Sequence, residues 1–484
     1  MQSRLLAAIW LSSFLVSLDY SAVNVVLPTL AREFNVGTSD VAWIALSYQT
    51  VVVALTLTTG VVASRIGYLR VLAWSLGLFA VASLASAASS TLWALVGMRV
   101  LQGVGASMMF AIGPAIIKTM FQSRTHSRTF AVFSTAPTAG LCGGPALGGQ
   151  LTSMFGWEAI FLLSLAAGLL AIGLVLSVSA HGAQQARQDA PPASQRVNLA
   201  SVTLASAGLL ALVLGLNQGQ EWSWTSPPIL LLLAGSVVAL GLLVLEERRC
   251  STPIVDAALI ASPGFLHAGA VLFLVLVAFG GGVFLMPFYF EWFRKLDIDA
   301  VGLLLMIQPA VAIAVSIVAG LMFAETSRRA LCSVGISLFV MGLSVFVVAG
   351  GQAGLSVFVV GLCLMGAGQA LFYPALMQVS MAGVPDHLAA SASGLQASAR
   401  SLAQLLGIVL FETVFSGIFP AAQDAEAAAA ASGAVLLDMQ SAFRAVFCLG
   451  VGFALAAVLL AMMLVDTPKS SGGQSKPEGA EGKL

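Results

Sequence analysis

Residues 5–27 read LLAAIWLSSFLVSLDYSAVNVVL, an apolar run that contains one side chain charged at neutral pH, the carboxylate of Asp19. In an α-helix, about 20 such residues span the hydrocarbon core of a bilayer. Arg4 is the one charge before the run, and the run lacks a polar break with a small-residue cleavage site, so we expect a retained span and not a removed signal. The stretch therefore predicts a membrane-spanning helix with a carboxylate inside it.

The composition of the whole chain also indicates a membrane protein. Of its 484 residues, 59% are hydrophobic and 9% are charged, whereas soluble domains are usually about a quarter charged. The net charge of zero gives no reason to expect a nucleic-acid partner. The five cysteines stand singly, without the spacing of a metal site or redox motif. We therefore predict packing roles for them, with no metal and no cofactor.

Apolar runs of similar length recur along the chain in groups of six, two and six. The first six lie near residues 5–27, 41–63, 70–89, 93–115, 129–151 and 157–179. The next two lie near residues 199–216 and 228–245. The last six lie near residues 265–290, 300–323, 330–349, 354–378, 390–418 and 441–465. Of these, the glycine-rich ninth and twelfth are candidates for broken helices.

This grouping predicts an all-α polytopic membrane protein with fourteen transmembrane helices. We expect an N-terminal six-helix bundle over residues 1–180, and cytoplasmic linkers with two inserted helices over 181–263. A C-terminal six-helix bundle would follow over 264–466, and a disordered cytoplasmic tail over 467–484. Residues 420–440 would form a short interfacial helix or hairpin on the outer side.

The basic residues predict the orientation, because lysine and arginine accumulate in cytoplasmic loops. With both termini inside, fifteen of the 21 basic residues lie on the inner side and four on the outer side. The remaining two, Arg99 and Arg400, lie within spans. A missed span would invert every later loop and remove this asymmetry, so an even number of crossings is indicated.

Asp19 is the first ionisable group inside a span, and such groups usually face a cavity, a partner or a proton path. A carboxylate removed from water could take up and release a proton during transport. The alternative is a carboxylate held permanently by neighbouring donors. We favour the proton role, because asparagine or serine would make a polar lock at lower cost.

Arg99 lies in the fourth span, within residues 95–106 (LVGMRVLQGVGA). Gln102 follows one helical turn later, and the nearby glycines Gly103 and Gly105 allow another backbone to approach closely. Arginine stays charged, so it could hold the charge state of a nearby carboxylate without titrating. The alternative is a structural arginine that binds backbone carbonyls. The sequence leaves open whether Arg99 contacts Asp19.

The fifth span contains residues 140–149, GLCGGPALGG. Gly140, Gly144 and Gly148 recur every four residues and form one smooth stripe against which another helix can slide. Pro145 adds a kink. Close helix packing alone would explain this stripe.

These three segments together resemble the major facilitator superfamily, and within it the fourteen-helix drug:proton antiporters. Residues 18–28 (LDYSAVNVVLP) match the family's first-span motif, and Arg99 with Gln102 matches its fourth-span motif, which is implicated in proton transfer. Residues 140–149 look like the fifth-span motif that is associated with exporters. The resemblance covers essentially the whole chain, and it implies two six-helix bundles plus two linker helices.

The chain departs from the family between its second and third spans. The family has an aspartate before an arginine there, and this chain has Ser64 before Arg65, followed by Gly67. That aspartate normally helps to latch the cytoplasmic side, so Arg65 and Gly67 would belong to a weaker or different latch. After the fifth span, Glu158, Ser164 and Ala166 replace the family's arginine, asparagine and proline.

The thirteenth span carries a polar stripe, in which Gln396, Arg400 and Gln404 follow at successive turns. Such a stripe would line a polar cavity, although a structural or gating role suits Arg400 equally well. Glu412 lies about 18 Å further along the helix, too far to pair with Arg400. It would either bind a cationic substrate or a second proton, or face an interface. We expect Glu291, Arg294 and Lys295 to be rim charges just outside the ninth span.

The resemblance implies a proton-coupled exporter of amphipathic organic compounds or drugs, working by alternating access in the bacterial inner membrane. Asp19 and Arg99 would couple the proton, and Gln102, Gln396, Arg400, Gln404 and Glu412 are candidates for the substrate cavity. An exporter of an endogenous metabolite, such as a siderophore, and a transport-inactive sensor of the same fold are the alternatives. The protein would be a monomer, and a periplasmic adaptor and an outer-membrane channel are candidate partners. An enzyme is not expected, because neither a phosphate loop nor a nucleophile with its base is recognisable.

Overall fold

Long helices account for almost all of the part of the chain that the structure describes. The computed structural model describes residues 2–121, 126–182, 199–219, 222–249, 259, 262–322, 327–349, 353–382, 384, 389–424 and 434–464. The predicted orientation places the end of the first helix on the outer side of the membrane, and we use "outer" and "inner" in that sense.

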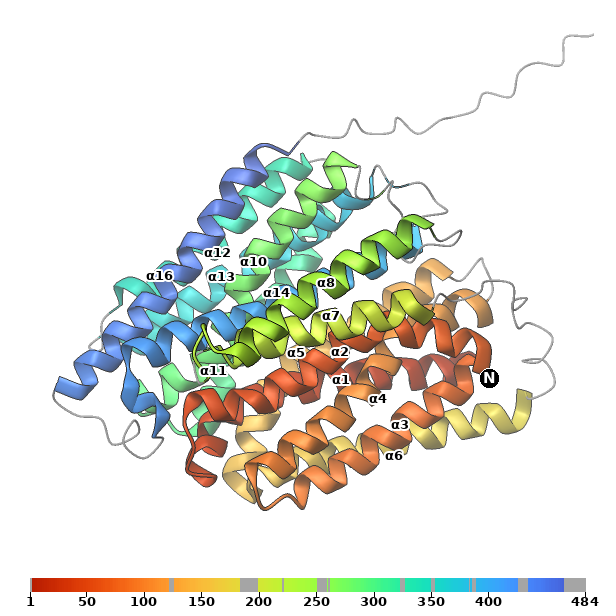
Figure 1. The fold of residues 1–484 in the computed structure, drawn as a ribbon, viewed down its shortest axis with the longest axis horizontal. Helices are drawn as coiled ribbons and strands as arrows, with labels where there is room; N and C mark the ends of the chain where they lie inside the picture. The colour runs from red at the N-terminus through yellow and green to blue at the C-terminus, as the bar shows by residue number, and fades with distance from the viewer. Residues whose placement is uncertain are drawn as a thin grey trace, which may run out of the picture.

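The first six helices form the N-terminal bundle (Figure 1). They are α1 (Gln2–Glu33), α2 (Thr38–Ile66), α3 (Tyr68–Ala87), α4 (Leu92–Met120), α5 (His126–Phe155) and α6 (Glu158–Gly182). α1 packs against α5 and α6, while α4 packs against α2 and α3. Gly67 separates α2 from α3 and has a φ of 106°, a backbone conformation that residues with a side chain rarely adopt. It therefore allows the chain to reverse sharply on the inner side.

The last helices form the C-terminal bundle. They are α10 (Pro263–Phe288) with the π-helical extension η2 (Tyr289–Phe293), α11 (Ile298–Met322), α12 (Arg328–Val348), α13 (Leu355–Met381), α14 (Ala389–Ile418), the 3-10 turn η4 (Pro420–Gln423) and α16 (Ala434–Met462). α10 and α13 are continuous helices, so the prediction that the glycine-rich ninth and twelfth spans are broken was wrong. Their glycines serve close packing instead, as at Gly280, where a Cβ would meet the Gln404 backbone.

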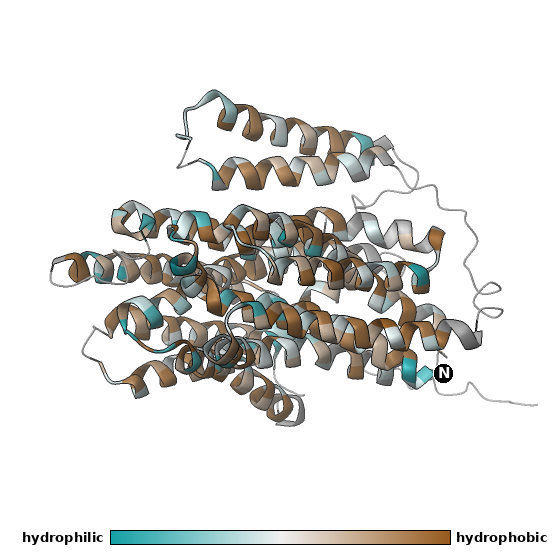
Figure 2. Ribbon diagram, turned by 90° about the horizontal axis from the view of Figure 1, so that it is seen from below, coloured by the Kyte–Doolittle hydropathy of each residue, from teal (hydrophilic) through white to brown (hydrophobic). Residues whose placement is uncertain are grey.

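Two further helices, α7 (Leu199–Asn217) and α8 (Pro227–Arg249), form a hairpin between the bundles in the sequence. Seen from below, this pair lies at the edge of the molecule (Figure 2). α7 contacts α2, where the Ser206 hydroxyl donates to the Ala54 carbonyl at 2.6 Å. α8 exposes large apolar side chains such as Leu231 and Val237, as a helix in contact with lipid would.

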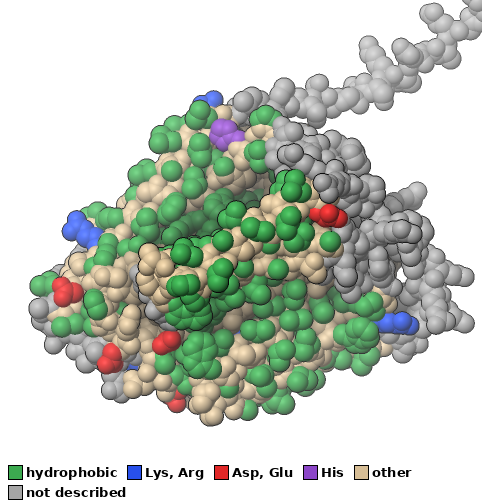
Figure 3. All heavy atoms as spheres, viewed as in Figure 1, with side chains coloured by type: hydrophobic (Ala, Val, Ile, Leu, Met, Phe, Trp, Pro, Cys, Tyr) green, Lys and Arg blue, Asp and Glu red, His purple; other side chains and the backbone are tan. Residues whose placement is uncertain are grey.

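The described helices are those of a multi-pass membrane protein, as predicted. Twelve of them are long and apolar enough to cross a bilayer within the described residues. α5 and α7 fall outside this set: the described apolar part of α7, Thr203–Leu216, is shorter, and α5 is rich in small and polar residues. Apolar side chains cover much of the visible surface, and charges are few on it (Figure 3). The proposed boundaries of the four regions remain predictions.

The two bundles meet mainly through α5 with α11 and α2 with α14. Several close contacts lie at the outer ends of these helices. A Cβ on Gly149 of α5 would meet the Ile298 carbonyl of α11 at 2.6 Å, and one on Gly37, before α2, would meet the Gln423 backbone. The bundles therefore approach each other very closely on the outer side.

Aromatic rings fill the outer half of the C-terminal bundle around η2. The ring of Tyr289 lies 5.2 to 5.8 Å from the rings of Phe290, Phe293, Phe346, Phe358, Phe443 and Phe447. Such packing fixes side chains in few rotamers. The cluster thus fixes η2 against the rest of the C-terminal bundle.

Candidate functional site

The Asp19 carboxylate and the Arg99 guanidinium form an ion pair inside the N-terminal bundle. Arg99 Nη1 donates to Asp19 Oδ2 at 2.5 Å, and the side chains of Arg99 and Asp19 are 1% and 0% exposed. Ser164 of α6 donates its hydroxyl to the other carboxylate oxygen, Oδ1, at 3.3 Å. The contact that the sequence left open is therefore present, and three helices supply it.

Arg99 has further partners that satisfy its charge. Its Nε donates to the Ile44 carbonyl of α2 at 3.2 Å, and its Nη1 also donates to Gln102 Oε1 at 2.9 Å. The face of the guanidinium lies 4.2 Å from the centre of the Tyr48 ring, a cation–π distance. Arg99 can thus keep its charge buried in several ways besides the pair with Asp19.

Gln102 lies in this network and not on a cavity wall. It is fully buried, and its Nε2 donates to the Ser83 hydroxyl of α3 at 2.8 Å. The amide accepts from Arg99 at one end and donates to Ser83 at the other, so it orients the guanidinium. The prediction that Gln102 lines the substrate cavity is corrected accordingly.

Three buried polar atoms near Asp19 have no hydrogen-bond partner among the described residues. They are the hydroxyls of Tyr20 and Tyr48 and the Oδ1 atom of Asn24. A buried polar atom without a partner costs about 1 to 3 kcal/mol, so such atoms need a reason. Water that reaches the ion pair would satisfy them, and such water is also what a proton needs to reach Asp19.

The glycine stripe of α5 packs directly on the turn of α1 that carries Asp19. A Cβ on Gly140 would meet the Phe14 carbonyl at 2.5 Å, and one on Gly148 would meet the Ala22 carbonyl at 2.9 Å. Between them, a Cβ on Gly144 would overlap the hydroxyl of Ser21. Pro145 lies on the other side, where the backbone of α11 approaches at Gly302. α5 is thus inserted between the helix of Asp19 and the opposite bundle.

The polar stripe of α14 mostly contacts its own bundle. Gln396 Nε2 donates to the Ser380 hydroxyl, and Arg400 Nη1 donates to the Tyr373 hydroxyl at 2.9 Å, both on α13. Gln404 is half-buried against α10. The stripe therefore holds α14 to its neighbours, and no contact among the described residues brings it to the Asp19–Arg99 pair.

Glu412 lies at the interface between the bundles. It is 5% exposed, and its Oε1 accepts from the Ser39 hydroxyl at 2.5 Å and from the Thr38 hydroxyl at 3.4 Å. These residues begin α2, and a helix N-terminus favours a negative charge. Of the two readings left open, the interface-facing glutamate agrees with these contacts.

The rim position expected for Glu291 was wrong. Glu291 lies in η2, is 5% exposed, and accepts hydrogen bonds from Arg32 and Thr29 of α1. Arg294 and Lys295 follow the helix; Arg294 is partly exposed and Lys295 is exposed. The side chain of Arg65 lies outside the described part of the chain, while Gly67 forms the reversal between α2 and α3.

A sequence model described as Major Facilitator Superfamily matches residues 9–408. The chain belongs to this superfamily. Multidrug resistance protein Stp of Mycobacterium tuberculosis is 26% identical over 412 residues, 85% of this chain and 75% of its own length. The tetracenomycin C resistance and export protein of Streptomyces glaucescens is 27% identical over 423 residues, 86% and 77% of the two chains.

Solved structures of transporters share the fold. The peptide transporter POT in complex with sulfate superposes with a TM-score of 0.69 at 13% identity and covers 96% of both chains. This likeness confirms the expected fold class. The match to the superfamily model and to the relatives above makes the chain a transporter of small substrates embedded in a bilayer. Among the described residues, no group of three or more His, Cys, Asp or Glu side chains could hold a metal ion.

Sequence reasoning missed Ser164, Ser83 and Tyr48, which complete the network around the ion pair. Serine and tyrosine are ordinary in transmembrane helices, so residue type gave no signal for them. Ser164 had one indirect signal, since it stands where the family tends to have asparagine. A hydrogen-bonding side chain at that position was therefore foreseeable, but its partner was not.

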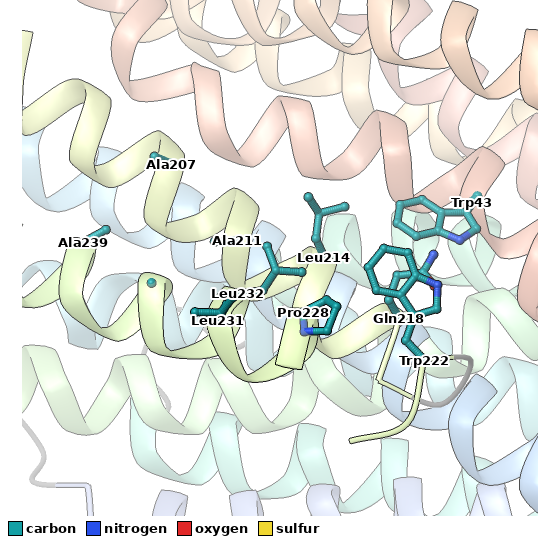
Figure 4. A pocket seen from close by; sticks show the side chains of 11 residues that line it. Trp43, Ala207, Ala211, Leu214, Gln218, Trp222, Pro228, Leu231, Leu232 and Ala239 are labelled. Atoms are coloured by element: carbon teal, nitrogen blue, oxygen red, sulfur yellow. The ribbon is translucent and has the colours of Figure 1, made fainter. Parts of the chain in front are cut away.

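An apolar groove of about 700 Å³ lies along the α7–α8 hairpin, with Trp43 of α2 at one end (Figure 4). Its outer end is lined by Trp43, Gln218 and Trp222, and its deeper wall by small and aliphatic residues of α7 and α8. The carbonyl of Ile44, the residue after Trp43, accepts from Arg99. α2 thus separates the groove from the ion pair.

Proposed function

We propose that the protein is a proton-coupled antiporter that exports amphipathic organic compounds or drugs by alternating access. The observation that carries this proposal is the buried ion pair between Asp19 and Arg99, on a helix that packs against the glycine stripe of α5. Multidrug and antibiotic resistance proteins among its relatives support the class of substrate. An exporter with this machinery needs only an ion gradient as its energy source.

The ion pair suggests how a proton would act. When Asp19 is ionised, it pairs with Arg99 and draws α1 towards α4. A proton on the carboxylate removes that attraction, while Arg99 keeps its contacts with the Ile44 carbonyl, Gln102 and Tyr48. The guanidinium therefore keeps these contacts in both states, and the attraction between α1 and α4 is what the proton removes.

The movement of α1 would reach the opposite bundle through α5. Gly140, Gly144 and Gly148 face α1 without side chains, so a small shift along the stripe meets little steric resistance. The other face of α5 contacts α11 near Gly302. α5 would thus transmit the protonation of Asp19 to the arrangement of the two bundles.

The proposal places the protein in the bacterial inner membrane as a monomer, with both termini in the cytoplasm. The excess of basic residues on the inner side supports this orientation. Export of an endogenous metabolite on the same machinery is the second candidate, favoured by the similarity to the tetracenomycin C resistance and export protein.

The first test is Asp19→Asn in proteoliposomes with a proton gradient. We expect the variant to fold and insert, because the amide keeps the shape and Arg99 keeps its other partners. Substrate-driven proton movement should fall to the level of liposomes without protein. Asp19→Glu, which retains a titratable group, is the matched control and should keep measurable coupling. Full coupled transport by Asp19→Asn would overturn the proton role of Asp19.

The second test identifies the substrate class. Purified protein is heated with lipophilic cations and with native metabolites, and a ligand that binds the folded state raises its unfolding temperature. Stabilisation by several lipophilic drugs supports drug export. Stabilisation by one metabolite and no drug favours the second candidate.

A further inference from the structure

A carboxylate of the C-terminal bundle reaches across to the N-terminal bundle on the outer side. Glu291 Oε1 accepts from Arg32 Nη2 and from the Thr29 hydroxyl, the latter at 3.4 Å. Both donors lie in the last turn or two of α1. Its second oxygen, Oε2, is buried and has no hydrogen-bond partner among the described residues.

Glu291 lines a polar pocket of about 460 Å³ at the outer mouth between the bundles. Arg32, Ser153, Lys295, Asp297 and Asp299 line the same pocket. Water in such a pocket can carry a proton, and an oxygen without a donor is a place where the proton can add. The pocket and the oxygen without a donor therefore both point to a proton as the ligand.

The local backbone is unusual at this residue. η2 is a five-residue π-helix at the end of α10, and such π-helical turns often mark functional positions. Its neighbours Tyr289 and Phe293 are fixed in the aromatic cluster of the C-terminal bundle. Glu291 is thus held firmly by its own bundle while its carboxylate contacts the other.

The two partners differ in their access to water. The side chain of Glu291 is 3% exposed, whereas that of Arg32 is 44% exposed. If the pair separates, Arg32 can turn into solvent at little cost, and the buried carboxyl group is the one that needs a new partner. A proton meets that need.

We propose that Glu291 is a proton-binding site on the outer side, and that its ionised carboxylate closes the outer gate by binding Arg32. A proton from outer water adds to Oε2 and forms an O–H bond, the carboxyl group loses its charge, and Arg32 is released into solvent. The outer ends of α1 and η2 then separate. The inference rests on the proposed antiport for its place in the transport cycle, but its test needs no substrate.

Other charged groups nearby fit this assignment. Partial burial, and then Arg32, lower the pKa of the Lys295 amine from its ordinary value, so positive charge is crowded at the pocket. Asp297 and Asp299 line the pocket from the start of α11. Arg294 points elsewhere, since it donates to the Ala353 carbonyl and lies over the Phe358 ring.

The packed helix α16 adds no charge to the pocket. Its outer residues Asp438 and Arg444 are exposed and are not among the residues that line it. Arg32 is therefore the group that competes directly with a proton for Glu291.

The test measures the width of the outer gate by spin-label distances in nanodiscs. Labels are placed at the exposed outer residues Ser90 and Ser356, each replaced by cysteine, in a background whose five native cysteines are removed. The N-terminal and C-terminal bundles then carry one label each. Distances are compared at alkaline and at acidic pH without substrate.

We expect the distance in the parent protein to increase at acidic pH. Glu291→Gln, which imitates the protonated group, should give the wide distance at both pH values. Arg32→Gln should do the same, because it removes the partner from the other side. Asp297→Asn, a neutralised neighbour in the same pocket, is the matched control and should behave as the parent.

Four results would overturn the inference: a parent distance that does not change with pH, a Glu291→Gln distance that still follows pH, a Glu291→Gln gate that stays narrow, or a pH response that is lost in Asp19→Asn. Repeating the measurement with Asp19→Asn separates this site from the proposed coupling site. If the pH response persists there, Glu291 acts whether or not Asp19 couples the transported proton. If the response vanishes with Asp19→Asn, Asp19 and not Glu291 is its source, and the inference is overturned.

Discussion

At the scale of single residues, Arg99 is the part of the site for which no other residue can substitute. It uses Nε, Nη1 and the face of its guanidinium in different contacts, whereas a lysine offers one compact ammonium group. Arg99→Leu would leave Asp19 as a buried charge without its counter-ion, at a cost of about 3 to 5 kcal/mol. We expect a clear fall in the unfolding temperature of the purified protein, and a smaller fall for Arg99→Lys.

A double variant separates charge from packing at this pair. Replacing both Asp19 and Arg99 with leucine removes the unpaired charge, so it should recover stability relative to Arg99→Leu alone. Proton-coupled transport should be absent both in Arg99→Leu and in the double variant. If the double variant is no more stable than Arg99→Leu, the loss comes from packing and not from an unpaired carboxylate.

The same residues show what a sequence can indicate about a site. Asp19 and Arg99 stand out because charges are rare inside apolar runs. Their contact could not be predicted, because 80 positions separate them in the chain and only the packing of α1 with α4 joins them. Glu291 was misplaced because Arg294 and Lys295 follow it, so the whole group looked like a loop. The π-helical turn that buries it has no distinct pattern of residues.

At the scale of helices, two glycines without side chains, Gly149 of α5 and Gly302 of α11, let the outer ends of the bundles meet. A Cβ on Gly149 would meet the Ile298 carbonyl at 2.6 Å, and one on Gly302 would overlap the Pro145 carbonyl. Gly149→Ala or Gly302→Ala should therefore hold the bundles apart on the outer side and widen the spin-label distance between positions 90 and 356.

Gly143→Ala is the matched control for this prediction. It lies on the same helix, but its Cβ would meet only the leucine methyl groups of Leu18 and Leu147, at 3.8 and 3.9 Å. Those are ordinary contacts, so the distance should stay as in the parent. An equal change in Gly143→Ala and Gly149→Ala would mean that any alanine in α5 disturbs the helix.

The helices themselves were predictable, and their ends were less so. Among the described residues, each of the fourteen long helices overlaps one of the apolar runs, and twelve of them are long and apolar enough to cross a bilayer, because the length of a span follows from the thickness of the bilayer. The helices extend beyond those runs: α2 begins at Thr38, where Glu412 supplies an acceptor from the other bundle. A contact of this kind depends on the tertiary structure, so the hydropathy of α2 alone does not predict it.

At the scale of the whole molecule, the α7–α8 hairpin is predicted to add two spans, and an even number would leave the sidedness of every later helix unchanged. The hairpin contacts the bundles mainly through α2, with the Ser206 to Ala54 hydrogen bond in that contact. The bundles meet each other directly, through α5 with α11 and α2 with α14. The hairpin is therefore not what joins the two halves.

Deleting both helices of the hairpin should then leave the orientation of the C-terminal bundle unchanged, whereas deleting α7 alone should disturb it. Without residues 199–249, the C-terminal bundle keeps its orientation, and Ser356→Cys in the cysteine-free background should be labelled by a membrane-impermeant maleimide added outside the cells. Without residues 199–217 alone, every later span would have to invert against its own basic loops. That variant should lose the labelling or fail to accumulate. Outside labelling of both variants to the same extent would show that the orientation of the C-terminal bundle does not depend on the number of preceding spans.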